Sequence, residues 1–163
     1  MDIIIGNICS LLAMGTDSLS STRKTTRDVL LVQCLSQLIY GIGAVILKGY
    51  SAAVQNAVSI LRNLTAIRGQ SPKQVQWILI ALGVVLGLLF NNRGIPGLLP
   101  VISNLEYSLA IFRFQDNERA LKVAFLFSVG LYAVFNMFIL NIAGFLTNTA
   151  VVITTAVYLI KTR

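Results

Sequence analysis

Histidine is absent from this sequence of 163 residues, and aspartate and glutamate together number only six. Histidine is the commonest general base and the commonest metal ligand in proteins, so its absence excludes the most frequent hydrolase and metal-site designs. The sequence also lacks an HExxH motif and a glycine-rich phosphate loop that ends in lysine. We therefore predict that the protein is not an enzyme and that it binds neither a metal nor a cofactor.

Charged residues are scarce as well, at 12% of the chain, whereas hydrophobic residues make up 56%. The mean hydropathy of +0.79 is far above that of a soluble domain of this length, and it indicates a polytopic membrane protein. No lysine or arginine precedes the first apolar run, which starts at Ile3, so this run lacks the basic region of a cleaved signal peptide. We expect it to be a transmembrane helix.

Short polar segments divide the sequence into seven apolar runs of about 16 to 20 residues. At a rise of about 1.5 Å per residue, each run has nearly the length that an α-helix needs to cross about 30 Å of hydrocarbon. The predicted fold is therefore an all-α membrane protein with seven transmembrane helices. The predicted helices are Ile3 to Leu19, Val29 to Leu47, Ser51 to Ile67, Val75 to Phe90, Pro96 to Phe114, Leu121 to Leu140, and Ala143 to Ile160.

Basic residues are distributed unevenly among the polar segments that join these runs. Lysine and arginine are held on the cytoplasmic side of a membrane, so the richer set of segments marks that side. If the N terminus is outside, only Lys48 and Arg93 lie on the outer side, and Arg62 lies within the bilayer. The other ten basic residues are then cytoplasmic: Arg23, Lys24, Arg27, Arg68, Lys73, Arg113, Arg119, Lys122, Lys161 and Arg163. This asymmetry predicts an N terminus outside and a cytoplasmic C terminus, and it accounts for most of the net charge of +7 without a nucleic-acid partner.

The polar segments also indicate an internal duplication. A tight turn at residues 48–50 joins predicted helices two and three, and a second one at residues 141–142 joins helices six and seven. Sliding the chain by 92 residues aligns Arg27 with Arg119, Ser36 with Ser128, Tyr40 with Tyr132, and Asn56 with Asn148. The sequence thus predicts two parallel three-helix bundles, residues 1–70 and 95–163, with a linker helix within residues 71–94.

Two asparagines and two tyrosines lie at similar depths in the predicted bundles. Asn56 and Asn148 are about five residues from the outer face, and Tyr40 and Tyr132 are about seven or eight residues from it. Two amides flanked by two aromatic faces would suit a small polar solute with hydroxyl groups or ring nitrogens. We therefore predict a solute-binding site at these four residues. The alternative is that the asparagines form hydrogen bonds between helices and serve only in packing.

Two opposite charges are predicted near the middle of the membrane. Arg62, on the third helix, and Glu106, on the fifth, are expected at matching depths, and an ion pair is the simplest way to hold both there. Such a pair would either lock the two bundles together or let Glu106 take up a proton during transport. A third possibility is that Arg62 extends to the cytoplasmic interface.

Helix breakers and small residues supply two further predictions. Pro100, within the fifth predicted helix, would free a backbone carbonyl and permit a kink, so it is a candidate transport hinge. Gly83 and Gly87 form a GxxxG pair on the fourth helix, which favours close packing within the bundle and also permits a homodimer.

Two segments of this sequence carry a resemblance to a known family. GYSAAVQNAVSILRNLTAIRGQ and GLLPVISNLEYSLAIFRF resemble the YgjV-type family of bacterial inner-membrane proteins, which implies an inner-membrane location. The arrangement of three, one and three helices, with an asparagine in the third and seventh, resembles the SWEET sugar transporters and the related PnuC-type carriers. From the SWEET pattern, only Asn56 and Asn148 carry over as substrate-facing positions, because the tryptophans that stack on sugar in that group have no match here.

These observations predict a membrane transporter that moves a small polar solute, such as a sugar, a nucleoside or a vitamin-like compound, by alternating access. The main alternative is a receptor or assembly factor of the same architecture that transports nothing. A water-free core in which Asn56 and Asn148 bond to each other would favour that alternative.

Overall fold

The computed structural model describes residues 1–20, 26–68, 72–114 and 117–161. Within these residues the chain forms seven α-helices and one short 3-10 helix, which confirms the predicted all-α fold with seven helices. The elements are α1 (Asp2–Ser20), α2 (Thr26–Ile46), α3 (Tyr50–Ile67), α4 (Lys73–Leu89), η1 (Pro96–Leu98), α5 (Leu99–Arg113), α6 (Glu118–Phe138) and α7 (Ile142–Lys161). Three basic residues used to predict the orientation, Arg23, Lys24 and Arg163, lie outside the described residues, and so does the predicted domain boundary at residues 70 and 71.

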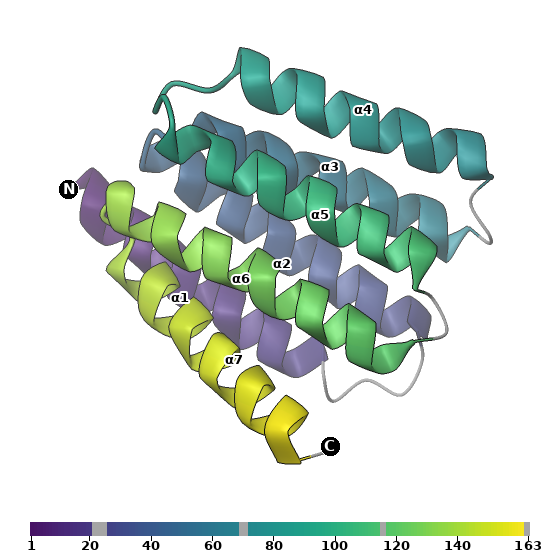
Figure 1. Ribbon diagram of the computed structural model, residues 1–163. Coiled ribbons are helices and arrows are strands. Elements are labelled where there is room, and N and C mark those ends of the chain that lie inside the picture. The colour runs from purple at the N-terminus through teal and green to yellow at the C-terminus, as the bar shows by residue number, and fades with distance from the viewer. Residues whose placement is uncertain (21–25, 69–71, 115–116, 162–163) are drawn as a thin grey trace.

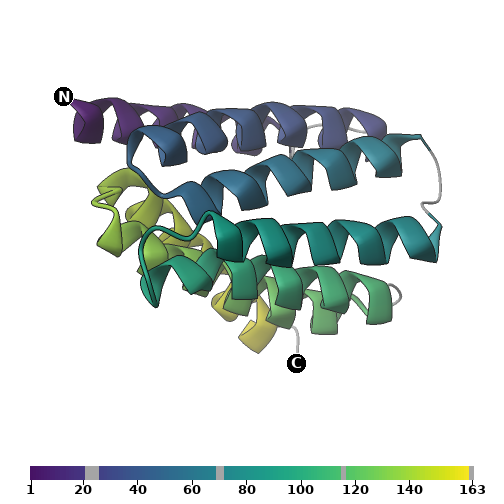
Figure 2. The same ribbon diagram turned by 90° about the horizontal axis from the view of Figure 1, so that it is seen from above.

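The helices pack in two layers, with α1, α2 and α3 behind α5, α6 and α7 (Figure 1). Each helix contacts its neighbour in sequence, and two further contacts, α3 with α5 and α1 with α7, join the layers at their edges. The contacts therefore close a ring in the order α1, α2, α3, α5, α6 and α7. Helix α4 packs outside this ring against α3 and α5, as the view from above also shows (Figure 2).

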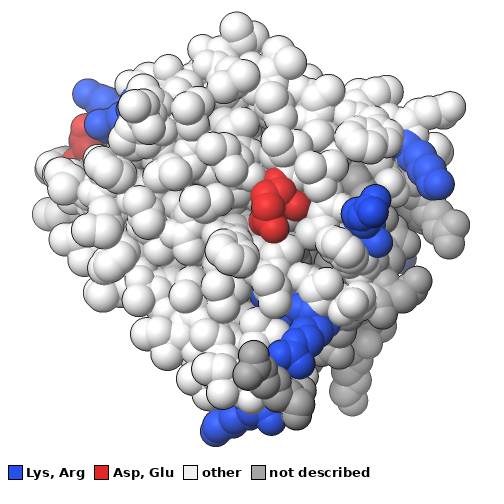
Figure 3. Space-filling model, in the orientation of Figure 1, with Lys and Arg blue, Asp and Glu red and all other residues white. Residues whose placement is uncertain are grey.

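Successive helices run in opposite directions, so the two chain ends lie at opposite ends of the molecule (Figure 1). We call the end that holds the N terminus and the α2–α3 and α6–α7 turns the turn end. On the face in Figure 3, basic side chains lie at the two ends of the helices, and more of them lie at the end opposite the turn end. This distribution agrees with the uneven placement of basic residues along the sequence.

The two tight turns have the same backbone geometry. Lys48 and Leu140 both adopt a left-handed conformation, with φ of 56° and 58°. The amide of the next residue then donates to a carbonyl five residues earlier, Gly49 to Ala44 and Asn141 to Asn136. These are Schellman motifs, which satisfy the last carbonyls of α2 and α6. Lys48 and Leu140 are 92 residues apart, as are the first residues of α2 and α6 and those of α3 and α7.

Polarity in this fold is the reverse of that in a water-soluble protein. Large apolar side chains are exposed on every long helix, including Leu12, Ile78, Phe127 and Ile153. Polar side chains fill much of the interior: Ser10, Ser36, Ser51, Gln55, Asn56, Ser59, Asn63, Ser103, Ser108, Ser128, Asn136 and Asn141 are buried. An apolar exterior of this extent indicates contact with lipid.

Length and composition distinguish α7 from the other helices. Within the described residues, α7 alone is both long enough and apolar enough throughout to meet a strict criterion for a membrane span. Four shorter apolar segments lie in α1, α2, α4 and α6, at Asp2–Thr16, Leu30–Ile46, Lys73–Leu89 and Lys122–Phe138. Helices α3 and α5 are interrupted by polar residues, and those side chains form the interior site described below.

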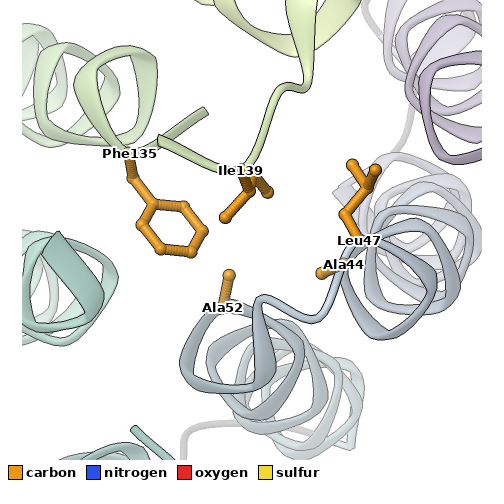
Figure 4. Close-up of a cluster of buried hydrophobic side chains, with 5 residues drawn as sticks. All are labelled: Ala44, Leu47, Ala52, Phe135 and Ile139. Atoms are coloured by element: carbon orange, nitrogen blue, oxygen red, sulfur yellow. The ribbon is translucent and has the colours of Figure 1, made fainter. Parts of the chain in front are cut away.

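An apolar cluster closes the interior at the turn end. It consists of Ala44, Leu47, Ala52, Phe135 and Ile139, so it joins residues from both layers. Phe135 is fully buried and points from α6 toward Ala52 of α3 (Figure 4). We call this group the turn-end cluster.

Side-chain hydrogen bonds also stabilise the two tight turns at the turn end. The guanidinium of Arg93, in the loop before α5, donates to the backbone carbonyls of Leu47 and Lys48 at 2.8 and 3.1 Å. The amide of Asn7, on α1, donates to the carbonyl of Leu140 at 3.0 Å and accepts from the amide of Ala143 at 2.7 Å. Each turn is thus held by the segment that packs beside it in the ring.

Candidate functional site

A chain of hydrogen bonds links α3, α4 and α5 inside the molecule. The Gln55 side chain donates to the backbone carbonyl of Gly83 at 2.8 Å and accepts from the Asn104 amide at 2.6 Å. One nitrogen of the Arg62 guanidinium, Nη1, donates to Asn104 Oδ1 at 3.3 Å and to Ser108 Oγ at 3.2 Å. The polar residues that interrupt α3 and α5 are therefore partners of one another.

Arg62 lies at the depth of the middle of α5. Its two partners on α5, Asn104 and Ser108, flank the central residue of that helix, so the guanidinium does not extend to the end of the bundle. It also lies within electrostatic range of the phenol groups of Tyr107 on α5 and Tyr132 on α6. This excludes the arrangement in which Arg62 reaches the cytoplasmic interface.

The predicted ion pair between Arg62 and Glu106 is not formed, which corrects the sequence-based expectation. Glu106 is two residues from both Asn104 and Ser108, which places its side chain about 200° around the helix from them. It lines a mainly apolar groove of about 520 Å³ between α5 and α6, together with Ala110, Phe114, Asn117, Arg119, Ala120, Val123, Ala124 and Phe127. Within the described residues, the buried Glu106 Oε2 has no hydrogen-bond partner.

The two predicted site asparagines both lie on the inner faces of their helices. Asn56 is 7% exposed and follows the turn-end cluster residue Ala52 by one helical turn. Asn148 is half-buried and follows the buried Gly144 by one turn, whereas Leu146, on the opposite face of α7, is 60% exposed. Neither amide has a hydrogen-bond partner in the described part of the chain, so the two do not bond to each other.

The two predicted site tyrosines are both half-buried. Tyr132 packs against the turn-end cluster and lies within electrostatic range of Arg62. Tyr40 lies on α2, next to Gly41, and a Cβ at Gly41 would be 3.6 Å from the Cβ of Asn56. The structure thus brings Tyr132 near Arg62 and places Asn56 against the part of α2 that carries Tyr40, whereas α3 and α7 lie on opposite sides of the ring.

Comparison with known protein families identifies the chain. A family model described as a bacterial inner membrane protein matches residues 4–163, almost the whole sequence. The chain belongs to the Imp-YgjV family. It is therefore a bacterial inner-membrane protein, as the sequence resemblance implied. No curated protein and no solved structure matches the chain at a significant level.

In this Imp-YgjV member, the GxxxG glycines of α4 pack against other helices of the same chain. Gly83 and Gly87 are both buried. A Cβ at Gly83 would lie 3.3 Å from Gln55 Oε1, and one at Gly87 would collide with Gln55 Nε2 and lie 2.6 Å from Val101 Cγ2. Close packing of α4 on α3 and α5 within the chain accounts for this pair, and a homodimer through Gly83 and Gly87 stays a prediction.

Pro100 occupies a different position from the one expected. The predicted fifth helix begins as the 3-10 helix η1, and Pro100 lies in the first turn of α5, where its missing amide hydrogen has no helical partner to lose. The carbonyl of Pro96 accepts from the amide of Leu99 instead. A hinge at Pro100 would therefore act at the junction of η1 and α5 and not as a kink within a continuous helix.

Sequence reasoning missed Asn104 and Ser108 as partners of Arg62, and Gln55 as a partner of Asn104. Their spacing carried a usable signal, because Gln55 and Arg62 are seven residues apart and Asn104 and Ser108 are four apart. Both spacings place the pair on one face of a helix. Two helices with matching polar faces at similar depth would have predicted an interhelical network in this Imp-YgjV protein.

Proposed function

We propose that this inner-membrane protein is a transporter that moves a small polar solute by alternating access. In this proposal the seven helices span the membrane with the N terminus outside. The ring of six helices consists of two parallel three-helix repeats, as in SWEET-like transporters, and α4 links them. Asn56, Asn148, Tyr40 and Tyr132 line the path of the solute.

The observation that carries the proposal is that the Asn56 and Asn148 amides have no hydrogen-bond partner in the described residues. Packing asparagines in membranes bond across helices, because an unpaired amide in an apolar interior is costly. Asn56 and Asn148 face inward and have no partner among the described residues. Their polar atoms are not fully enclosed, because within the same residues the fully enclosed unpaired atoms belong to Ser51 and Glu106. Inward-facing amides without a protein partner are suited to bind a solute.

The arrangement of the helices supports the two-repeat interpretation. A twofold axis along the membrane normal would exchange α1 with α5, α2 with α6, and α3 with α7. It would also exchange the α3–α5 contact with the α7–α1 contact, and both of these are present. The 92-residue spacing of the helix starts and of the two left-handed residues is what such a duplication produces.

Alternating access then requires the turn end to open. The turn-end cluster closes the interior at the end that we assign to the outside, so the described structure corresponds to an outward-closed state. Opening would separate Phe135 from Ala52, with the η1–α5 junction at Pro100 as the hinge. Glu106 is then a candidate proton carrier that acts without Arg62.

The proposal predicts that Asn56→Ala and Asn148→Ala each weaken solute binding by tenfold or more without unfolding the protein. Purified protein would be tested by thermal shift against sugars, nucleosides, vitamins and amino acids, since a bound ligand raises the melting temperature by mass action. Solutes that bind would then be tested for uptake into proteoliposomes. Gln74→Ala, an exposed amide at the start of α4, is the matched control.

Binding and uptake that persist in both variants would exclude the proposed path. Binding without uptake would favour the receptor of the same architecture, and the absence of both would point to an assembly factor.

A further inference from the structure

We propose that Arg62 is an anion-binding residue and that the solute is a small hydroxylated monocarboxylate. This inference rests on the proposed function, since it assigns a chemical class to the solute that passes Asn56 and Asn148.

The first step is the charge balance around Arg62. All hydrogen-bond partners of its guanidinium in the described residues are neutral, namely Asn104 and Ser108. The carboxylate of Glu106 lies on the opposite side of α5, in the α5–α6 groove. A cation in the interior of a membrane protein is costly without a counter-charge, and such residues mark paths of substrates and ions. The site thus has one positive charge to be neutralised.

The second step is the geometry of the free donors. Both bonds to α5 use Nη1, which leaves Nε and Nη2 without a partner in the described chain. Neither nitrogen is fully enclosed, because the fully enclosed unpaired atoms in the part of the chain that the structure describes belong to Ser51 and Glu106. Nε and Nη2 form one edge of the guanidinium plane, and two parallel N–H groups on that edge match the two oxygens of a carboxylate.

The third step concerns the charge and size of the ligand. A monoanion would leave the interior neutral, whereas a phosphate dianion would leave a net negative charge in the bilayer. Asn56 and Arg62 are six residues apart on α3, about 9 Å along the helix axis and about 120° apart around it. Asn56 lies against α2 and Arg62 against α5, so a ligand that reaches both must extend across the inner side of α3. A sugar-acid-sized chain with its carboxylate at Arg62 has the length to bring hydroxyl groups toward the Asn56 amide.

The test uses ligand pairs that differ chiefly at the carboxylate. Gluconate, glucuronate and lactate are compared with glucitol, glucose and propane-1,2-diol by thermal shift of the full chain in lipid nanodiscs at constant ionic strength. Glycerol 3-phosphate is the dianionic comparison. We expect at least one carboxylate to bind tenfold or more tightly than its neutral partner and than the phosphate.

Single-residue variants then show which side chain produces the preference for the carboxylate. Arg62→Gln is expected to abolish the preference for the carboxylate, a loss of tenfold or more, whereas Arg62→Lys retains part of it because the charge remains while the planar donor edge is lost. Arg68→Gln, at the exposed end of α3, is the matched control and should keep the full preference. Asn56→Ala should weaken the acid and its neutral partner to the same extent.

The inference is overturned by equal binding of acid and neutral partner, by tighter binding of the phosphate, or by a carboxylate preference that survives in Arg62→Gln. If Arg62→Gln does not fold, the comparison of ligand pairs on the wild-type protein and on Arg62→Lys decides the matter. Binding of neutral partners alone would refute the anion site and leave the proposed transport function intact. Failure of all six ligands to bind refutes the anion site, and the wider solute panel then tests transport separately.

Discussion

At the scale of single residues, Gln55 connects more elements than any predicted site residue. It is 1% exposed, and its amide holds α3 to Gly83 of α4 and to Asn104 of α5. Asn104 in turn accepts one of the Arg62 bonds. The position of the guanidinium therefore depends on a neutral amide two turns away on the same helix.

We expect Gln55→Ala to lower the free energy of unfolding by about 2 kcal/mol, because it leaves the half-buried Asn104 amide without its acceptor. Denaturant unfolding in detergent, followed by circular dichroism, measures this change. Gln74→Ala, which removes an exposed amide from α4, should have little effect. Equal stability of the two variants would show that the bond at 2.6 Å contributes nothing measurable.

At the scale of elements, α4 packs closely on the ring because Gly83 and Gly87 have no side chains at the contact. Gly87 lies against Gln55 and Val101, so the helix backbone approaches α3 and α5 closely. In contrast, Gly130 on α6 has no atom within 4 Å of a Cβ placed on it. An alanine substitution at Gly87 and at Gly130 therefore distinguishes the effect of close packing from the effect of helix propensity.

Gly87→Ala should destabilise the protein by about 1–3 kcal/mol, since the added methyl group overpacks the α4 contact. Gly130→Ala should leave stability unchanged or raise it by up to about 1 kcal/mol, because alanine favours the helix and the space is open. Thermal unfolding of both variants under identical detergent conditions gives the comparison. A Gly87→Ala protein as stable as Gly130→Ala would mean that α4 is not closely packed.

At the scale of the whole molecule, the proposed orientation places the turn end outside. Ile95, 82% exposed near the α2–α3 turn, and Lys73, exposed at the start of α4, lie at opposite ends of the molecule. In a protein whose two cysteines are replaced, Ile95→Cys should react with a membrane-impermeant maleimide on intact spheroplasts. Lys73→Cys should react only after the membrane is permeabilised. The reverse pattern of labelling would place the N terminus in the cytoplasm.

Much of the architecture could be predicted from the sequence because it depends on local properties. Seven apolar runs of suitable length predicted seven helices, and the turn residues predicted their ends to within a few residues, apart from the N-terminal part of the Pro96–Phe114 helix. The inward positions of Asn56 and Asn148 agree with the predicted site. Their role in binding a solute stays a prediction.

Hydropathy and turn chemistry act over a few residues, so the class of protein and the position of each helix along the chain follow from the amino-acid sequence. Which side chains meet depends on the rotation of each helix about its axis, and that rotation is set by the packing of the helices on one another. Depth alone paired Arg62 with Glu106, yet the rotation of α5 turns Asn104 and Ser108 toward the guanidinium and Glu106 away from it. The same rotation leaves one edge of Arg62 without a partner in the described chain, and this edge is the basis of the proposed anion site.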